Sequence, residues 1–184
     1  CTPDQNGVLY VNSSVSGGDE SGDSWANAIK ELGDALLGAK NNPDVKEIWV
    51  AKGTYKPKYN AEDGEDNDGG RANSFVLVSN VKVYGGFAGN ETSLIQREWK
   101  SNETVLSGDI GTLNVHTDNV YHIAIAAGVT GVVLDGFTLE NGYSKGSVGA
   151  SNFYVNGVAV REDYGAGIFI RNSTANFNNL IIRN

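Results

Sequence analysis

The chain has 184 residues, which is enough for a single domain with a sizeable hydrophobic core. Its formal net charge is −8 and its pI is near 4.7, so it is not expected to bind nucleic acid by neutralising phosphates. Its apolar runs are far shorter than the roughly 20 residues that a membrane-spanning helix needs.

The only cysteine of the chain is its first residue, Cys1. Bacterial lipoproteins are cut immediately before a cysteine that then carries the lipid, so Cys1 is predicted to be a lipid anchor. Residues 1–7 (CTPDQNG) are polar and would form the tether between the lipid and the folded domain. This interpretation places the protein on a bacterial cell surface, at the outer membrane. The alternative is that the sequence simply begins at a cysteine.

Residues 8–73 are predicted to form an N-terminal cap, composed of a strand, a helix and a strand followed by an acidic loop. Runs of strand-forming residues at Val8–Asn12 and Lys46–Tyr55 predict the two strands. A β-solenoid leaves an open, apolar end with unpaired strands, and a helix laid across that end would cover it.

The cap helix is predicted to run from Ser24, which would serve as its N-cap, to Ala39. Apolar residues recur at spacings of three and four between Trp25 and Leu36, as on the buried face of an amphipathic helix. Trp25 in this helix and Trp49 in the following strand are both assigned to the hydrophobic core.

The longest irregular stretch carries five carboxylates in seven residues, from Glu62 to Asp68. Calcium prefers several flexible oxygen ligands, so this loop is a candidate calcium site. The candidate ligands are Asp63, Glu65, Asp66 and Asp68. Their spacing does not match that of an EF-hand loop, and a solvated surface loop is the alternative.

From residue 74 on, the sequence predicts the stacked coils of a β-solenoid. His122–Asn141 aligns with Gly165–Asn184 without a gap, at an offset of 43 residues. Apolar positions coincide, with Ile125 over Ile168, Leu134 over Phe177 and Leu139 over Ile182. Strands this short are stable only where neighbouring coils bury their apolar sides. Two coils of about 21 residues would fill the period, as in a parallel β-helix.

An antiparallel sandwich with evenly spaced turns is the alternative to this solenoid. The segment Phe153–Val160, between the two copies, alternates in polarity and is predicted to be either a hairpin or a further coil. Because Asn184 falls at the end of a coil, the β-helix of residues 74–184 is expected to continue in a longer natural protein.

Six segments, in a fixed order, carry a resemblance to a known family. They are SWANAIKELGDAL (24–36), IWVAKGTYKP (48–57), FVLVSNVKVYGGFAGNET (75–92), TVLSGDI (104–110), LDGFTLENG (134–142) and GAGIFI (165–170). Together they resemble the right-handed parallel β-helix proteins of Gram-negative bacterial surfaces, in the pectin-lyase-like superfamily. The repeats are similar to those of polymorphic outer-membrane proteins, in which a GG[AI]-type motif precedes F-x-x-N. The chain departs from that pattern at Ala166, which replaces a glycine, and at Leu180, which replaces the asparagine.

The resemblance implies a mainly β fold, a right-handed parallel β-helix with an N-terminal α/β cap. It says less about activity, because the family includes surface and adhesive proteins as well as enzymes. Asp109 and Asp135 are the nearest approach to the carboxylate pair of a hydrolase, but both lie in turn sequences. His116 and His122 have no third ligand at zinc spacing. No catalytic residues are therefore assigned.

The expected function is non-catalytic binding or adhesion at the cell surface, with a glycan such as a surface polysaccharide, or an outer-membrane protein, as the partner. Aromatic residues in loops are candidate ligand contacts, because their rings offer large apolar faces. They are Tyr59, Trp99, Tyr143, Phe153 and Tyr154. Calcium is the only cofactor considered. The alternative is a polysaccharide lyase or glycoside hydrolase whose active site lies mostly in coils outside this sequence.

Overall fold

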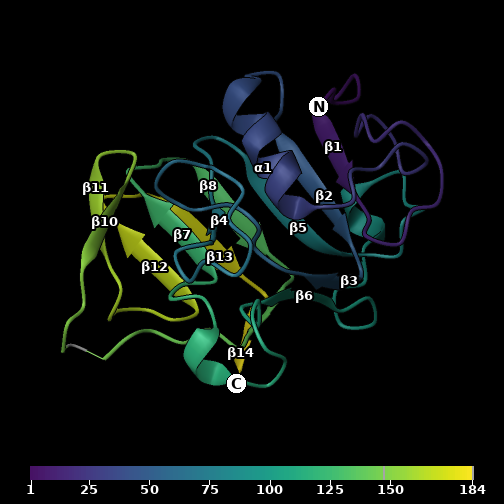
Figure 1. Ribbon diagram of the computed structural model, residues 1–184. Coiled ribbons are helices and arrows are strands. Elements are labelled where there is room, and N and C mark those ends of the chain that lie inside the picture. The colour runs from purple at the N-terminus through teal and green to yellow at the C-terminus, as the bar shows by residue number, and fades with distance from the viewer. Residues whose placement is uncertain (147, 184) are drawn as a thin grey trace.

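The computed structural model describes residues 1–146 and 148–183, and Figure 1 shows how they are arranged. The described part is mainly strand, with one α-helix, α1 (Leu32–Asn41), and two short 3₁₀ helices, η1 (Leu94–Gln96) and η2 (His116–Asp118). The strands are β1 (Val8–Val11), β2 (Glu47–Ala51), β3 (Gly53–Tyr55), β4 (Phe75–Val76), β5 (Lys82–Phe87), β6 (Thr104–Ser107), β7 (Ala124–Ala127), β8 (Val132–Asp135), β9 (Thr138–Glu140), β10 (Asn152–Val155), β11 (Val158–Arg161), β12 (Ile168–Arg171), β13 (Ala175–Asn178) and β14 (Ile181–Arg183).

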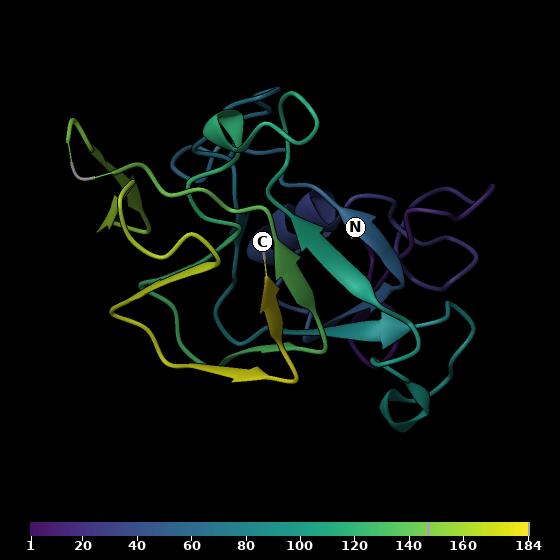
Figure 2. The same cartoon turned by 90° about the horizontal axis from the view of Figure 1, so that it is seen from below.

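Three sheets carry all of these strands except β10 and β11. Their strand orders are β1-β2-β5-β8-β13, β14-β9-β6-β3 and β12-β7-β4, and every pair within them is parallel. From β3 onward, the chain visits the four-stranded, the three-stranded and the five-stranded sheet in rotation. Figure 2 shows the strands of the four-stranded sheet side by side. The expectation of a mainly β fold is confirmed, and the antiparallel sandwich is wrong because the three sheets are parallel.

The internal repeat pairs with itself, but with one change of register. Strands β13 and β14 pair with β8 and β9 at an offset of 43 residues, which places Phe177 beside Leu134 as predicted. Strand β12 pairs with β7 at an offset of 44 residues, so Ile168 lies beside Ala124 and not beside Ile125.

The ungapped alignment fails there because two equivalent turns differ in length. The turn between β7 and β8 (128–131) has one residue more than the turn between β12 and β13 (172–174). Stacked strands keep the same side chains facing the core only if the extra residue is accommodated in the turn and not in a strand. The final aligned pair joins Asn141 with Asn184, and Asn184 lies outside the described residues.

Helix α1 begins at Leu32, so the prediction of a helix from Ser24 is wrong. The residues before it are held by strand β1 instead. The Ile29 N–H donates to the carbonyl of Tyr10, and the Ile29 carbonyl accepts the N–H of Asn12, both at 2.9 Å. An extended Ile29 paired with a strand cannot also belong to a helix.

The two tryptophans of the predicted cap meet in an aromatic cluster. Trp25 packs edge-on against Tyr10 with ring centroids 4.9 Å apart, and Trp49 stacks on Phe87 at 4.8 Å. Trp49 is buried as predicted, whereas Trp25 is half-buried and donates its indole N–H to the carbonyl of Glu91. The apolar spacing around Trp25 therefore reflects packing beside a strand rather than a helical face.

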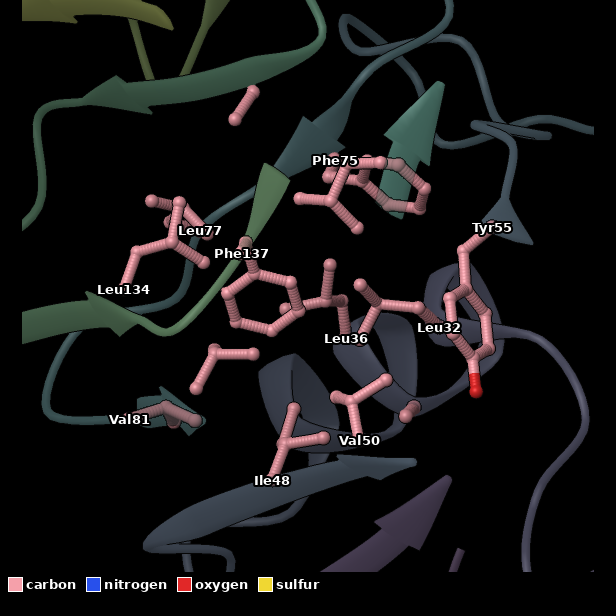
Figure 3. Close-up of a cluster of buried hydrophobic side chains, with 14 of the residues drawn as sticks. Leu32, Leu36, Ile48, Val50, Tyr55, Phe75, Leu77, Val81, Leu134 and Phe137 are labelled. Carbon is pink, nitrogen blue, oxygen red and sulfur yellow. The ribbon is translucent and has the colours of Figure 1, made fainter. Parts of the chain in front are cut away.

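One hydrophobic core is shared by the three sheets and α1, and Figure 3 shows its members pointing toward one another. The helix contributes Leu36, the five-stranded sheet Ile48 and Leu134, the four-stranded sheet Tyr55 and the three-stranded sheet Phe75. Burying each such side chain contributes about 1.5–3 kcal/mol. Packing between the sheets, rather than strand propensity, therefore stabilises strands of two to six residues.

Candidate functional site

A pocket of about 370 Å³ opens between helix α1, the loop of residues 59–64, strand β4 and the hairpin formed by β10 and β11. Its walls are mostly apolar. They are formed by Leu36 and Leu37 of α1, Tyr59, Val76 of β4, Val129 of the turn between β7 and β8, and Val155 of the hairpin. A volume of this order and an apolar lining are typical of sites that take a small ligand or a side chain of a partner.

Polar groups at the pocket are largely occupied by the protein itself. The Asn156 amide N–H donates to the carbonyl of Ala127 at 2.9 Å, and the Asn60 side-chain oxygen accepts the N–H of Glu62 at 2.9 Å. The hydroxyl of Tyr59 donates to Asp34, and this hydrogen bond is the main reason that the Tyr59 pKa is raised. Part of the polar lining of the pocket is therefore already engaged, and the side chain of Lys40, which also lines the pocket, is exposed.

Two segments far apart in the chain meet at this pocket. The Glu62 carboxylate, from the acidic loop, accepts the backbone N–H of Tyr154 in β10 at 3.1 Å. Strands β10 and β11 are antiparallel, so the hairpin alternative for this segment is confirmed. Asn156 and Gly157 form its turn with φ of 51° and 76°, the conformation that an Asn-Gly turn adopts.

The five predicted aromatic contacts do not form one surface. Tyr59 lines the pocket, whereas Tyr154 of β10 does not line it and is 53% exposed. Phe153 lies in strand β10, is only 7% exposed and packs in a second core cluster, so its predicted placement in a loop is wrong. Trp99 lines a separate hollow with Lys100 and Glu103.

Tyr143 is 43% exposed and lies beside Arg71, which donates to its backbone carbonyl at 2.7 Å. Sequence reasoning missed Leu37 and the hairpin residues Val155 and Asn156. The Asn-Gly turn flanked by alternating apolar residues favours the hairpin over a further coil, but it does not predict that the hairpin and α1 line the same pocket.

The predicted calcium ligands Asp63, Glu65, Asp66 and Asp68 are all exposed. Asp63 accepts the N–H of Glu65 at 2.9 Å, and Asp66 pairs with Lys58 at 3.1 Å. Within residues 1–146 and 148–183, no group of three His, Cys, Asp or Glu side chains that could hold a metal ion is found. These acidic residues are therefore neighbours in the sequence without forming such a group in the described part of the chain.

Asp135 and Asp109, the nearest approach to a carboxylate pair, have different surroundings. Asp135 forms an ion pair with Arg97 at 2.9 Å and accepts the amide N–H of Asn179 at 2.8 Å. Asp109 is 5% exposed and accepts the N–H of Asn114 at 3.2 Å. The Asp135 carboxylate thus holds a structural ion pair rather than an acid or base beside a substrate.

His122 is fully buried, and its Nδ1 lies 3.1 Å from the carbonyl oxygen of Gly165. Its ring packs against Phe169, with centroids 5.2 Å apart. Burial lowers the His122 pKa because it disfavours the charged imidazolium. The other histidine, His116, is exposed in η2.

The Cys1 thiol is exposed and lies 3.7 Å from the carbonyl oxygen of Asp34, against Gly38 of α1. The N–H of Thr2 donates to the carbonyl of Ser21 at 2.8 Å, so the first residues are attached to the domain. None of the helices in the described part of the chain has the length and the apolar character that a membrane crossing requires.

Comparison with known proteins gave no match, either to a family model, to a curated protein or to a solved structure.

Proposed function

We propose that this chain is a non-catalytic binding module of a bacterial cell-surface lipoprotein, built as a right-handed parallel β-helix with an N-terminal α/β cap. Support for the β-helix comes from the rotation of the chain through three parallel sheets and from the repeat offsets of 43 and 44 residues. A solenoid of this kind carries its function on loops and insertions, because its coils are devoted to stacking.

The pocket beside α1 is the proposed binding site, and the residues that line it are the main support for the proposal. The walls are mostly apolar, and the Asn60 side-chain oxygen and the Asn156 amide N–H are already hydrogen-bonded within the protein. A sugar needs several free donors and acceptors, whereas an apolar side chain needs a dry, shaped cavity. The lining therefore favours an apolar side chain of a protein partner over a glycan.

The test is a selection of random peptides on phage against the immobilised chain, run beside a glycan array. We expect selected peptides with an aliphatic or aromatic anchor, and we expect Leu37→Glu to weaken their binding at least tenfold by placing a charge in the pocket. Ile95→Glu is the matched control, because Ile95 is 91% exposed in η1 and should tolerate the charge. Binding that survives Leu37→Glu would place the site elsewhere, and glycan binding lost in Tyr59→Ala would favour a sugar ligand.

The alternative of a polysaccharide lyase or glycoside hydrolase has less support from these residues. A hydrolase needs one carboxylate as acid and another as base or nucleophile at a shared substrate site. Asp135 is committed to Arg97 and Asn179, as described above.

The proposed lipid anchor is Cys1, whose thiol is exposed. The test is the intact mass of the protein purified from its native membrane, together with membrane fractionation of a Cys1→Ser variant. A mass increase equal to a diacylglyceryl or triacyl group, and release of the variant from membranes, are the expected results. An unmodified thiol in membrane-bound protein would contradict the anchor.

A further inference from the structure

The loop of residues 108–120, between strands β6 and β7, is closed by a hydrogen bond from the N–H of Val120 to the carbonyl of Gly108 at 3.0 Å. Two carboxylates turn into it. Asp109 accepts the N–H of Asn114 through Oδ2 at 3.2 Å, and Asp118 accepts the N–H of Thr112 through Oδ2 at 2.8 Å.

Each of these carboxylates has a second oxygen that is buried and has no hydrogen-bond donor. The same is true of the side-chain oxygen of the neighbouring Asn119, which is only 2% exposed. Six such orphaned side-chain atoms occur in the described residues, and half of them belong to Asp109, Asp118 and Asn119. A buried acceptor without a donor is unfavourable, and more so when the acceptor is a carboxylate oxygen.

A glycine makes room for one of these carboxylates. A Cβ atom at Gly111 would lie 2.6 Å from Cγ and Oδ2 of Asp118, closer than side-chain carbons approach. Any other residue at this position would force the Asp118 carboxylate or the loop to move. The loop is therefore shaped to hold a carboxylate against its own backbone.

We propose that this loop binds a calcium ion through the free Oδ1 atoms of Asp109, Asp118 and Asn119. All three are oxygens that accept and cannot donate, two of them carry charge, and calcium completes its shell with backbone carbonyls and water. A divalent cation would satisfy the orphaned oxygens and compensate the charge of the two carboxylates. The exposed imidazole of His116 is not needed, because calcium prefers oxygen to nitrogen.

Arg71 sets a limit on the affinity. Its guanidinium donates to the backbone carbonyl of Asn119 at 2.7 Å, so a positive charge lies near the site without satisfying the side-chain oxygen. With two carboxylates and this neighbour, the expected dissociation constant is on the order of 10⁻⁴–10⁻³ M, as in extracellular calcium modules. The proposal does not depend on the pocket or on its ligand.

The experiment measures thermal unfolding of the full chain in EDTA and across a CaCl₂ titration, with Tb³⁺ luminescence as an independent probe. Calcium at roughly 100 times its dissociation constant should raise Tm by about 5–10 °C. The same concentration of MgCl₂ should raise it less, because magnesium demands stricter geometry. Asp118→Asn should weaken calcium binding at least tenfold.

The matched control is Asp66→Asn in the exposed acidic loop, which removes one carboxylate from a richer cluster and should leave the calcium response intact. A second variant, Asn119→Asp, adds a charged ligand and should tighten calcium binding while lowering Tm in EDTA. No calcium response in the native chain would overturn the proposal. A response that survives Asp118→Asn, or one that disappears in Asp66→Asn, would also overturn it.

Discussion

Two acidic loops of this protein place their carboxylate oxygens in opposite environments, one exposed to water and the other partly buried. Residues 62–68 carry five carboxylates, all of them exposed to water, and Asp66 pairs with Lys58. Residues 109–119 carry only two carboxylates, yet Asp109 and Asp118 each bury an oxygen that has no donor. Water satisfies an exposed carboxylate at little cost, whereas a buried one needs a partner. A buried carboxylate oxygen without a hydrogen-bond donor is therefore a better indication of a cation site than the number of acidic residues.

Asp135 completes the comparison as a buried carboxylate that has both a charged and a polar partner, Arg97 and Asn179. Asp135→Ala would leave the guanidinium of Arg97, whose side chain is 13% exposed, without its counter-ion. We expect the free energy of unfolding to fall by about 3 kcal/mol, because an uncompensated buried charge is costly. Denaturant unfolding measures this loss. A loss below about 1 kcal/mol would mean that Arg97 finds water or another acceptor.

The Asp109→Asn variant separates the two roles of that carboxylate. In EDTA, removing the charge of a buried carboxylate that has one oxygen without a donor should raise the free energy of unfolding by about 1 kcal/mol, since the new amide N–H can donate to a neighbouring oxygen. In saturating calcium the order should reverse, and the native chain should be the more stable. If the variant were the more stable of the two chains both with and without calcium, the result would argue against a cation at this loop.

The buried His122 predicts a pH dependence. Its pKa is lowered in the fold by burial, so below about pH 6.5 the unfolded chain takes up a proton that the folded chain does not. Stability should therefore be constant above that pH and fall as pH decreases below it, by at most about 1.4 kcal/mol per pH unit. Unfolding at pH 7.5, 6.5 and 5.5 measures the slope. His122→Asn should flatten it, while His116→Gln, at an exposed site, should not change it.

The smallest effect is expected in the exposed loop. Asp66→Asn removes the partner of Lys58, an ion pair in which the two side chains are 42% and 56% exposed. Solvent screens such pairs, so Tm should change by no more than about 1 °C, and the change should vanish at high salt. Thermal scans at low and high ionic strength test this. A larger shift would show that the loop contributes to the fold.

Local patterns predicted local structure well. The period of the repeat placed β8, β9, β13 and β14 in register, because stacked coils must bury equivalent positions. The same reasoning failed where a distant partner decides the conformation. Ile29 lies in a sequence with helical spacing, yet its backbone bonds go to strand β1. The shorter turn at 172–174 likewise leaves no sign in the apolar pattern.

The candidate site was less predictable than the fold. Tyr59 was recognised as a loop aromatic, but the pocket exists only because the hairpin packs across the chain onto the acidic loop, through Glu62 and Tyr154. The richest acidic cluster attracted the calcium prediction, whereas the orphaned oxygens lie in a loop with two aspartates. Burial is a property of the packed chain, and a list of residue types does not contain it.

The sequence by itself determined that this chain forms short parallel strands with one helix, since its apolar periods and turn residues act over a few neighbouring positions. Only the tertiary structure decided where α1 begins, which segments enclose the pocket and which oxygens are left buried without donors. Those features depend on which surfaces lose water when distant segments pack. The same packing determines which buried polar and charged groups have partners.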